Sequence, residues 1–112
     1  MNKVSLIDRA KGYVAASNAH DLELIRPMFR ETAVYQSSGV GFHEGGAQIV
    51  AMMEGFFGVN PDVHWQVQNY KTIEGNGVEF DFIMCMGGEK SKGVERIFFD
   101  ETGAIIRIEM IR

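Results

Sequence analysis

Cysteine, proline and long hydrophobic runs are scarce in this sequence. Among its 112 residues there are two prolines and a single cysteine, Cys85. A lone cysteine cannot form an internal disulfide, which is typical of a reducing compartment, and residues 1–10 do not resemble a secretion signal. We therefore expect a cytoplasmic protein. Because no apolar run approaches the roughly 20 residues that span a bilayer, no membrane partner is expected either.

Positive charge and metal-binding patterns are scarce as well. The chain has 11 Lys and Arg against 15 Asp and Glu, a net charge of −4, so it lacks the basic surface that nucleic acids require. Its three histidines show no helical pairing, and no cysteine cluster exists. The glycine-rich residues 38–46 match neither a phosphate loop nor a dinucleotide fingerprint. We predict no nucleic-acid partner, no metal and no cofactor.

Large apolar side chains, by contrast, are abundant. Seven Met, eight Phe, three Tyr and one Trp occur in a chain whose hydrophobic fraction, 46%, is ordinary for a globular protein. The length predicts a single domain over residues 1–112. The large side chains can pack a solid core or line an internal pocket, and the composition does not decide between the two.

The periodicity of the apolar residues predicts helices and strands in a definite order. Asp21 is expected to cap a short second helix that carries Phe29 on its apolar side, and Asn76 with Gly77 predicts a tight hairpin turn. Residues 38–46 are interpreted as a loop and residues 87–93 as a turn. Helices are predicted over 4–18, from 22 onward, and over 47–57, and strands over 32–37, 63–73, 78–86, 94–100 and 104–111.

This order, α-α-β-α-β-β-β-β, predicts an α+β fold in which a curved antiparallel sheet wraps around helices. The later strands carry apolar residues on both faces, because Ile83 and Cys85 lie opposite the phenylalanine set of their strand. A second copy of the chain would cover the additional apolar face. We therefore predict a homodimer that packs through the sheet.

Several segments resemble a known superfamily. Residues 13–22 (YVAASNAHDL), the Ile-x-x-x-Phe that ends at Phe29, and the Glu-Thr-Ala-Val-Tyr of residues 31–35 are similar to the nuclear transport factor 2-like superfamily. Residues 45–57 and 103–109 continue the similarity. Its nearest branches by pattern are the SnoaL-like polyketide cyclases and the ketosteroid isomerases. The resemblance implies a conical α+β barrel of cystatin-like fold, which encloses a deep apolar pocket and is usually dimeric.

The resemblance to ketosteroid isomerases also implies roles for particular residues. Their oxyanion-binding tyrosine falls on Tyr13, and their second oxyanion donor, a protonated aspartic acid, falls on Glu95. Their proton-shuttling aspartate falls on Gln36. A carboxamide cannot accept a proton near neutral pH, so the isomerase mechanism lacks its base at this position.

Each candidate has an ordinary structural alternative. Tyr13 can be a core tyrosine, and Glu95 can form an ion pair with Arg107 or across a dimer instead of acting as a neutral acid. The alternation of its strand leaves the face of Glu95 open, since each face carries one charge. His43 in the glycine-rich segment is the remaining candidate that titrates near neutral pH, although loop histidines are commonly solvated.

The predicted function is the binding of a small, largely apolar molecule inside the cone. Two hypotheses follow: a cofactor-independent isomerase- or cyclase-like enzyme acting on an enolisable carbonyl compound, or a non-catalytic ligand-binding or dimerisation module. The residues expected to line the pocket are Gln36, Met53, Phe57, Trp65, Phe80, Phe82, Met84, Ile97, Phe99, Ile108 and Met110.

Overall fold

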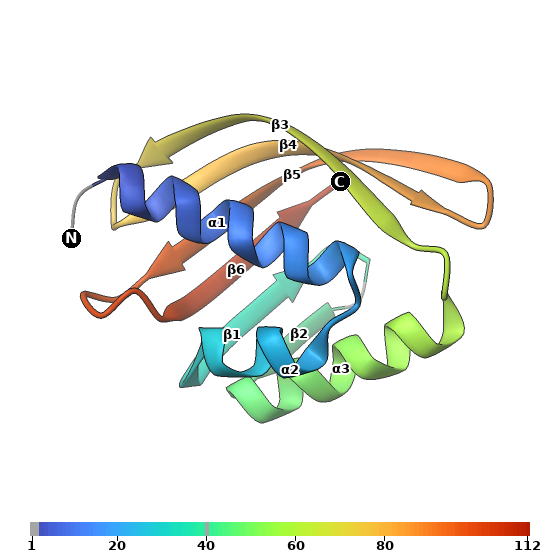
Figure 1. The fold of residues 1–112 in the computed structure, drawn as a ribbon, viewed down its shortest axis with the longest axis horizontal. Coiled ribbons are helices and arrows are strands. Elements are labelled where there is room, and N and C mark those ends of the chain that lie inside the picture. The colour runs from blue at the N-terminus through green and yellow to red at the C-terminus, as the bar shows by residue number, and fades with distance from the viewer. Residues whose placement is uncertain (1–2, 40) are drawn as a thin grey trace.

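A computed structural model describes residues 3–39 and 41–112 of the chain. Part of the predicted loop, residue 40, therefore lies outside the described residues. Figure 1 shows helices packed against a strongly curved sheet. In chain order the elements are α1 (Lys3–Asn18), α2 (Leu22–Ile25), η1 (Arg26–Met28), β1 (Phe29–Ser37), β2 (Gly41–Glu44), α3 (Gly46–Val59), β3 (His64–Ile73), β4 (Gly77–Met86), β5 (Glu89–Phe99) and β6 (Ile105–Ile111).

The first helix buries one stripe of its surface. Leu6, Ala10, Tyr13 and Ser17 recur at helical spacing and are all buried. The helix ends at Asn18, as predicted. The Asn18 side chain forms hydrogen bonds with the backbone of β3 at the edge of the sheet, where no further strand of the described residues pairs with it. Its amide nitrogen donates to the backbone oxygen of Trp65 (2.9 Å), and its oxygen accepts from the Trp65 backbone nitrogen (2.7 Å). These two bonds join the end of α1 to the start of β3.

The second helix begins at the predicted cap and is short. The Asp21 carboxylate accepts a hydrogen bond from the backbone nitrogen of Leu24 at 3.1 Å. Pro27 follows in the 3-10 turn η1 and has no N–H with which to continue an α-helix. Phe29 therefore begins β1 instead of lying on a helix face.

The sheet has the strand order β2-β1-β6-β5-β4-β3. Strand β6 lies between β1 and β5; it pairs in parallel with β1, whereas the other neighbouring strands pair antiparallel. The predicted α+β class and the curved sheet are confirmed. The strand β2 is additional, because residues 38–46 were expected to be a loop. It is four residues long and pairs with the end of β1 from Val34 to Ser37.

Two hairpins connect the long strands β3, β4 and β5. The first turns through Gly75 and Asn76, both with positive φ; the predicted hairpin forms, but Gly77 is already the first residue of β4. The second turns at Gly87 and Gly88, which also have positive φ, so β5 already begins at Glu89. The predicted turn over 87–93 is therefore too long. The first residues of β5 pair with the end of β4, and this pairing extends the strand.

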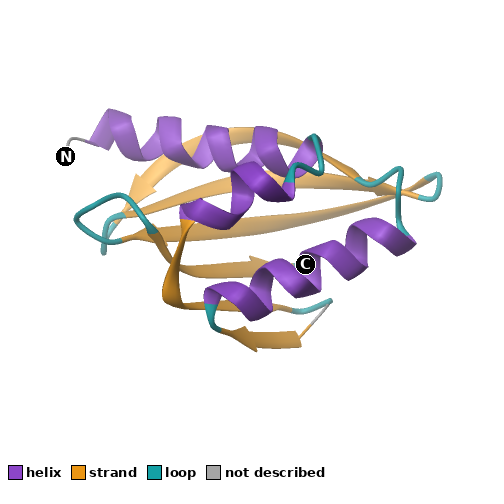
Figure 2. Cartoon of the chain, turned by 60° about the horizontal axis from the view of Figure 1, so that its bottom comes forward, coloured by secondary structure: helices purple, strands orange, loops and turns teal. Residues whose placement is uncertain are grey.

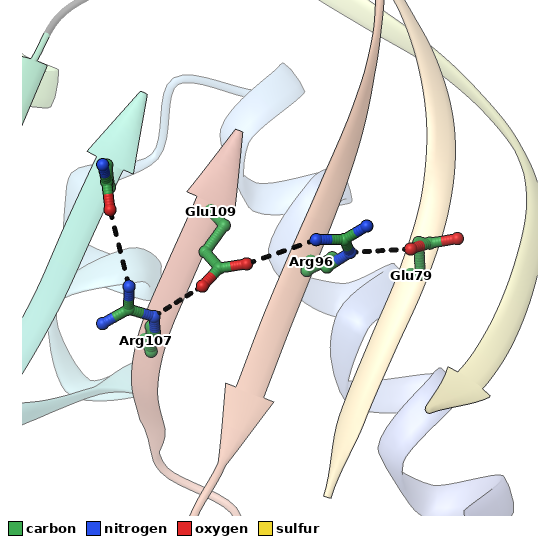
Figure 3. A network of polar contacts seen from close by, with 5 residues as sticks. Glu79, Arg96, Arg107 and Glu109 are labelled. Carbon is green, nitrogen blue, oxygen red and sulfur yellow. Dashed lines mark hydrogen bonds and ion pairs between the residues drawn. The ribbon is translucent and has the colours of Figure 1, made fainter. Parts of the chain in front are cut away.

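The helices lie on the inner side of the sheet, and charged residues cover the outer side. The helices are grouped on the concave side of the strands in Figure 2, and Figure 3 views the opposite side with helices behind the sheet. There Arg96 bonds to Glu79 (2.7 Å) and approaches Glu109 (3.6 Å), which also pairs with Arg107 (2.7 Å). Arg107 extends the network by donating to the Gln36 side-chain oxygen at 3.4 Å. This outer-face network crosses strands β4, β5, β6 and β1.

Within the described residues, no helix is both long enough and apolar enough to cross a membrane.

Candidate functional site

A cavity of about 240 Å³ lies between α1, α3 and the inner face of the sheet. Its walls are mostly aromatic and methionine side chains. Eight of the residues predicted for the site border it: Tyr13, Met53, Phe57, Trp65, Phe80, Met84, Glu95 and Met110. The surplus of large apolar residues thus forms both a core and the wall of a hollow.

Glu95 points to the inner face and lies between apolar neighbours. In the sheet it is opposite Phe80 of β4 and Met110 of β6, and only 4% of the residue is exposed. Burial disfavours the carboxylate and raises the pKa of Glu95 from 4.5 to about 8. The ion pair with Arg107 considered from the sequence does not form, because Arg107 pairs with Glu109 on the outer face. At neutral pH Glu95 is mainly a neutral acid, which can donate a hydrogen bond.

Two tyrosines that border the cavity lie near this acid. Burial raises the pKa of Tyr13 well above its usual value, and the charge of Glu95 raises it further. The same two effects, in the same order, raise the pKa of Tyr35. The hydroxyl of Tyr35 donates weakly to the sulfur of Met110 (3.8 Å), and the ring of Tyr13 packs edge-on against Phe29. Tyr13, Tyr35 and Glu95 therefore provide three protonated oxygens at one end of the cavity.

Three polar atoms around the cavity are buried and have no hydrogen-bond partner among the described residues. They are Oε2 of Glu95, the indole Nε1 of Trp65 and Oγ of Ser17. The Ser17 hydroxyl is still close enough to the Tyr13 phenol to lower its pKa, against the larger effect of burial. Buried polar groups without partners are costly, so a ligand that bonds to them would recover that cost.

Four of the predicted wall residues, Phe82, Ile97, Phe99 and Ile108, belong to the solid core instead. Ile97 and Ile108 are opposite each other, two residues along their strands from the Glu95–Met110 pair, and both are fully buried. The ring of Phe82 lies over Gly93 on the neighbouring strand, where a Cβ would collide with it. The cavity thus occupies one end of the cone, and the remainder is filled.

Gln36 and His43 also lie outside the cavity wall. The alternation of β1 directs Tyr35 and Ser37 inward, so Gln36 is exposed on the outer face beside Arg107. The predicted pocket position of Gln36 is therefore corrected. His43 is opposite Tyr35 on the edge strand β2 and half-buried, but it does not border the cavity. In the part of the chain that the structure describes, no carboxylate or imidazole other than Glu95 lines the cavity.

Sequence reasoning missed several wall residues. Tyr35 could have been found, because it alternates with the buried Ala33 and Ser37 along β1. Arg112, which follows β6, carries no pattern that would place it at a cavity. The wall residues not foreseen are Val14, Ser17, Tyr35, Ser37, Gly39, Met52, Phe56, Val67, Met86 and Arg112.

Known structures share this architecture. A cystatin-fold protein from Novosphingobium aromaticivorans matches with a TM-score of 0.85 and 20% identity, covering 96% of this chain and 97% of its own. The epoxide hydrolase/cyclase-like enzyme SalBIII, which acts in pyran ring formation in salinomycin, matches with a TM-score of 0.86 and 17% identity, covering 98% and 92%. A candidate polyketide cyclase from Sinorhizobium meliloti matches with 0.82 and 16%, covering 98% and 99%. These likenesses define the cystatin-like fold.

The family follows from the sequence itself. The model of the SnoaL-like domain matches residues 10–110, so the chain belongs to the SnoaL-like domain family. No curated protein matches the chain significantly. Among the described residues, no group of three or more His, Cys, Asp or Glu side chains is arranged to hold a metal ion.

Proposed function

We propose that the chain binds a small, largely apolar molecule in the cavity and acts on its carbonyl group as a cofactor-independent isomerase- or cyclase-like enzyme. The observation that carries this proposal is the buried Glu95, whose Oε2 lacks a partner at the cavity wall. The resemblance to isomerases and the cyclase names among its structural neighbours support the same reaction class.

Tyr13 and Glu95 are proposed to donate hydrogen bonds to the oxygen of the bound carbonyl. When an α-proton leaves, charge moves onto this oxygen, and preorganised donors stabilise that charge more than the neutral ground state. The raised pKa of Glu95 keeps its proton in place at neutral pH. Tyr35, whose pKa responds to the same carboxyl group, is positioned to support this arrangement.

The base is the part of the reaction that the cavity wall does not supply. Gln36 is on the outer face, and His43 does not border the cavity. We propose that the proton acceptor is a basic group carried by the substrate itself. That group would take the α-proton while Tyr13 and Glu95 stabilise the enolate oxygen by hydrogen bonds.

Exchange of α-protons for deuterium provides a direct test. Enolisable aryl ketones that carry a carboxylate as their internal base are incubated with the protein in D₂O and followed by NMR, with wild type, Tyr13→Phe and Glu95→Gln compared. Loss of the Tyr13 hydroxyl should slow exchange by about 10²-fold or more, and replacing the Glu95 acid with the weaker amide donor of glutamine should slow it as well. Gln36→Ala is the matched control and should leave the rate unchanged. Equal rates in wild type and both donor variants would contradict the proposed catalysis.

The alternative is a ligand-binding module without catalysis, and the absence of a base from the described cavity wall favours it. It predicts that 2-naphthol, which presents a hydroxyl on a flat apolar ring, raises the thermal unfolding temperature. No chemical change of any ketone should then be seen. Binding together with exchange at the uncatalysed rate would select this alternative.

We also propose that a second copy of the chain covers the outer face of the sheet. Half-buried Ile83, Cys85 and Val94 lie on the outer positions of β4 and β5, and Ile111 is 46% exposed. Association would bury these apolar groups around the outer-face network. Sedimentation at micromolar concentration should give twice the 12.5 kDa mass of one chain. A monomer mass would contradict the dimer.

A further inference from the structure

Arg112 lies at the exposed edge of the cavity. Of the residues that border the cavity, Gly39 and Arg112 are the exposed ones, so the cavity reaches the surface beside them. The backbone nitrogen of Arg112 donates to Oγ of Ser38 at 3.0 Å, which fixes the chain at this point. The side chain can then lie over the segment that contains Gly39.

The guanidinium of Arg112 lies directly on the backbone of Gly39. A Cβ at residue 39 would collide with Nη2 and would lie 3.0 Å from Cζ of Arg112. Any other residue at this position would displace the guanidinium. The glycine thus lets a positive group lie close against the rim of an otherwise apolar hollow.

This positive charge is not neutralised within the described residues. None of the ion pairs of these residues includes Arg112. The nearby Glu109, which borders the same surface depression, is already engaged by Arg107 (2.7 Å) and Arg96 (3.6 Å). Glu95 is protonated at neutral pH. No acidic side chain of the described residues therefore pairs with this guanidinium, in a chain whose net charge is −4.

Arg112 and Glu95 belong to different parts of the cavity. The pKa of Tyr35 is raised by burial and by Glu95, and lowered by Arg112, so this phenol is near both groups. Glu95 is 4% exposed and lies opposite Met110, whereas Arg112 lies two residues beyond Met110 and is exposed. A neutral acid thus lies inside, and a cation lies at the exposed end.

We infer that the molecule bound in this cavity carries an anionic group of the carboxylate type, which pairs with Arg112 while the apolar body fills the hollow. The oxygen at the opposite end of the molecule bonds to Glu95. A guanidinium binds a carboxylate through two parallel hydrogen bonds, which fixes orientation as well as affinity. This inference rests on the proposed ligand-binding function and adds the charge and the orientation of the ligand.

Two probes that share a ring system test the inference. 2-Naphthol presents only the hydroxyl, and 6-hydroxy-2-naphthoate adds a carboxylate on the far ring. Their dissociation constants are measured by calorimetry at neutral pH with wild type, Arg112→Gln and the charge-matched control Arg26→Gln. Arg26 is exposed and does not border the cavity. We expect the carboxylate to improve binding to wild type and to the control about tenfold.

Arg112→Gln should bind both probes with similar dissociation constants, so that the preference for the carboxylate is lost. Gly39→Ala keeps the charge but displaces the guanidinium, so it should lose most of the preference for the carboxylate. If 2-naphthol binds wild type and the carboxylate brings no gain, the inference is overturned and the proposed binding function stands. If 2-naphthol itself fails to bind, the binding function is overturned, and the inference falls with it.

Discussion

Replacing Glu95 with glutamine should change how the stability of the protein depends on pH. The pKa of this carboxyl is 4.5 in an exposed state and about 8 in the folded protein. Below about pH 4.5 both states hold the proton. As the pH rises from there to about 8, the unfolded chain releases the proton while the folded protein retains it. The free energy of unfolding of wild type therefore falls through this window and levels off above it.

The size of the effect follows from the two pKa values. They are about 3.5 pH units apart, and each unit corresponds to about 1.4 kcal/mol, so the loss between pH 4.5 and 8 is at most about 5 kcal/mol. A domain of this kind has roughly 5–15 kcal/mol in total, so the loss is large enough to measure. Glu95→Gln has no proton to lose and should lack this decline.

Urea unfolding at closely spaced pH values measures the difference. The free energy of Glu95→Gln minus that of wild type should increase from acid to about pH 8, because all other groups titrate alike in both proteins. Glu89→Gln, at the exposed start of the same strand, is the control and should follow wild type. Parallel curves for wild type and Glu95→Gln between pH 5 and 9 would refute a desolvated Glu95.

Three further substitutions test contacts within the core, between α1 and β3, and in the turn after β5. Gly93→Ala should cost about 1–3 kcal/mol in urea unfolding, because the new Cβ would collide with the ring of Phe82; an unchanged stability would contradict the close contact. Asn18→Ala removes two hydrogen bonds to the backbone of Trp65 and should cost about 1–3 kcal/mol, with a change in tryptophan fluorescence as the local readout. The pKa of Asp100 is lowered to about 2, chiefly by its hydrogen bonds within the following turn. Its contribution to the free energy of unfolding is therefore lost as the pH falls from 3.8 to about 2. In urea unfolding over this range, the free energy of unfolding of Asp100→Asn should decrease less than that of wild type.

Most of the fold could be predicted because its periodicities are strong. Strand β4 alternates buried Phe80, Phe82 and Met84 with half-buried positions, and α1 repeats its buried residues at helical spacing. What could not be predicted depends on pairing. Strand β2 and the first residues of β5 have no apolar alternation of their own, and a neighbouring strand makes them extended.

The site was predictable in its residue types but not in its geometry. The alternation of β5 places Glu95 and Arg96 on opposite faces, and sequence alone could not say which face the helices cover. Its cross-strand neighbours Phe80 and Met110 on the inner face settle the question for Glu95. For Gln36, the resemblance suggested a pocket position, whereas the alternation of β1 turns it outward. Arg112 depends on a contact with Gly39 that no local pattern encodes.

The position of β6 has a consequence for how the chain reaches its final state. It is the last strand in the sequence, yet it lies between β1 and β5. Until β6 is in place, the β1–β2 hairpin and the β3–β4–β5 meander are two separate fragments without a shared edge. Joining β1 to β6 requires contact between distant parts of the chain, such as Tyr35 with Ile108, and such contacts form slowly. During synthesis on the ribosome the cavity would therefore be assembled last, when the segment containing Met110 and Arg112 has emerged.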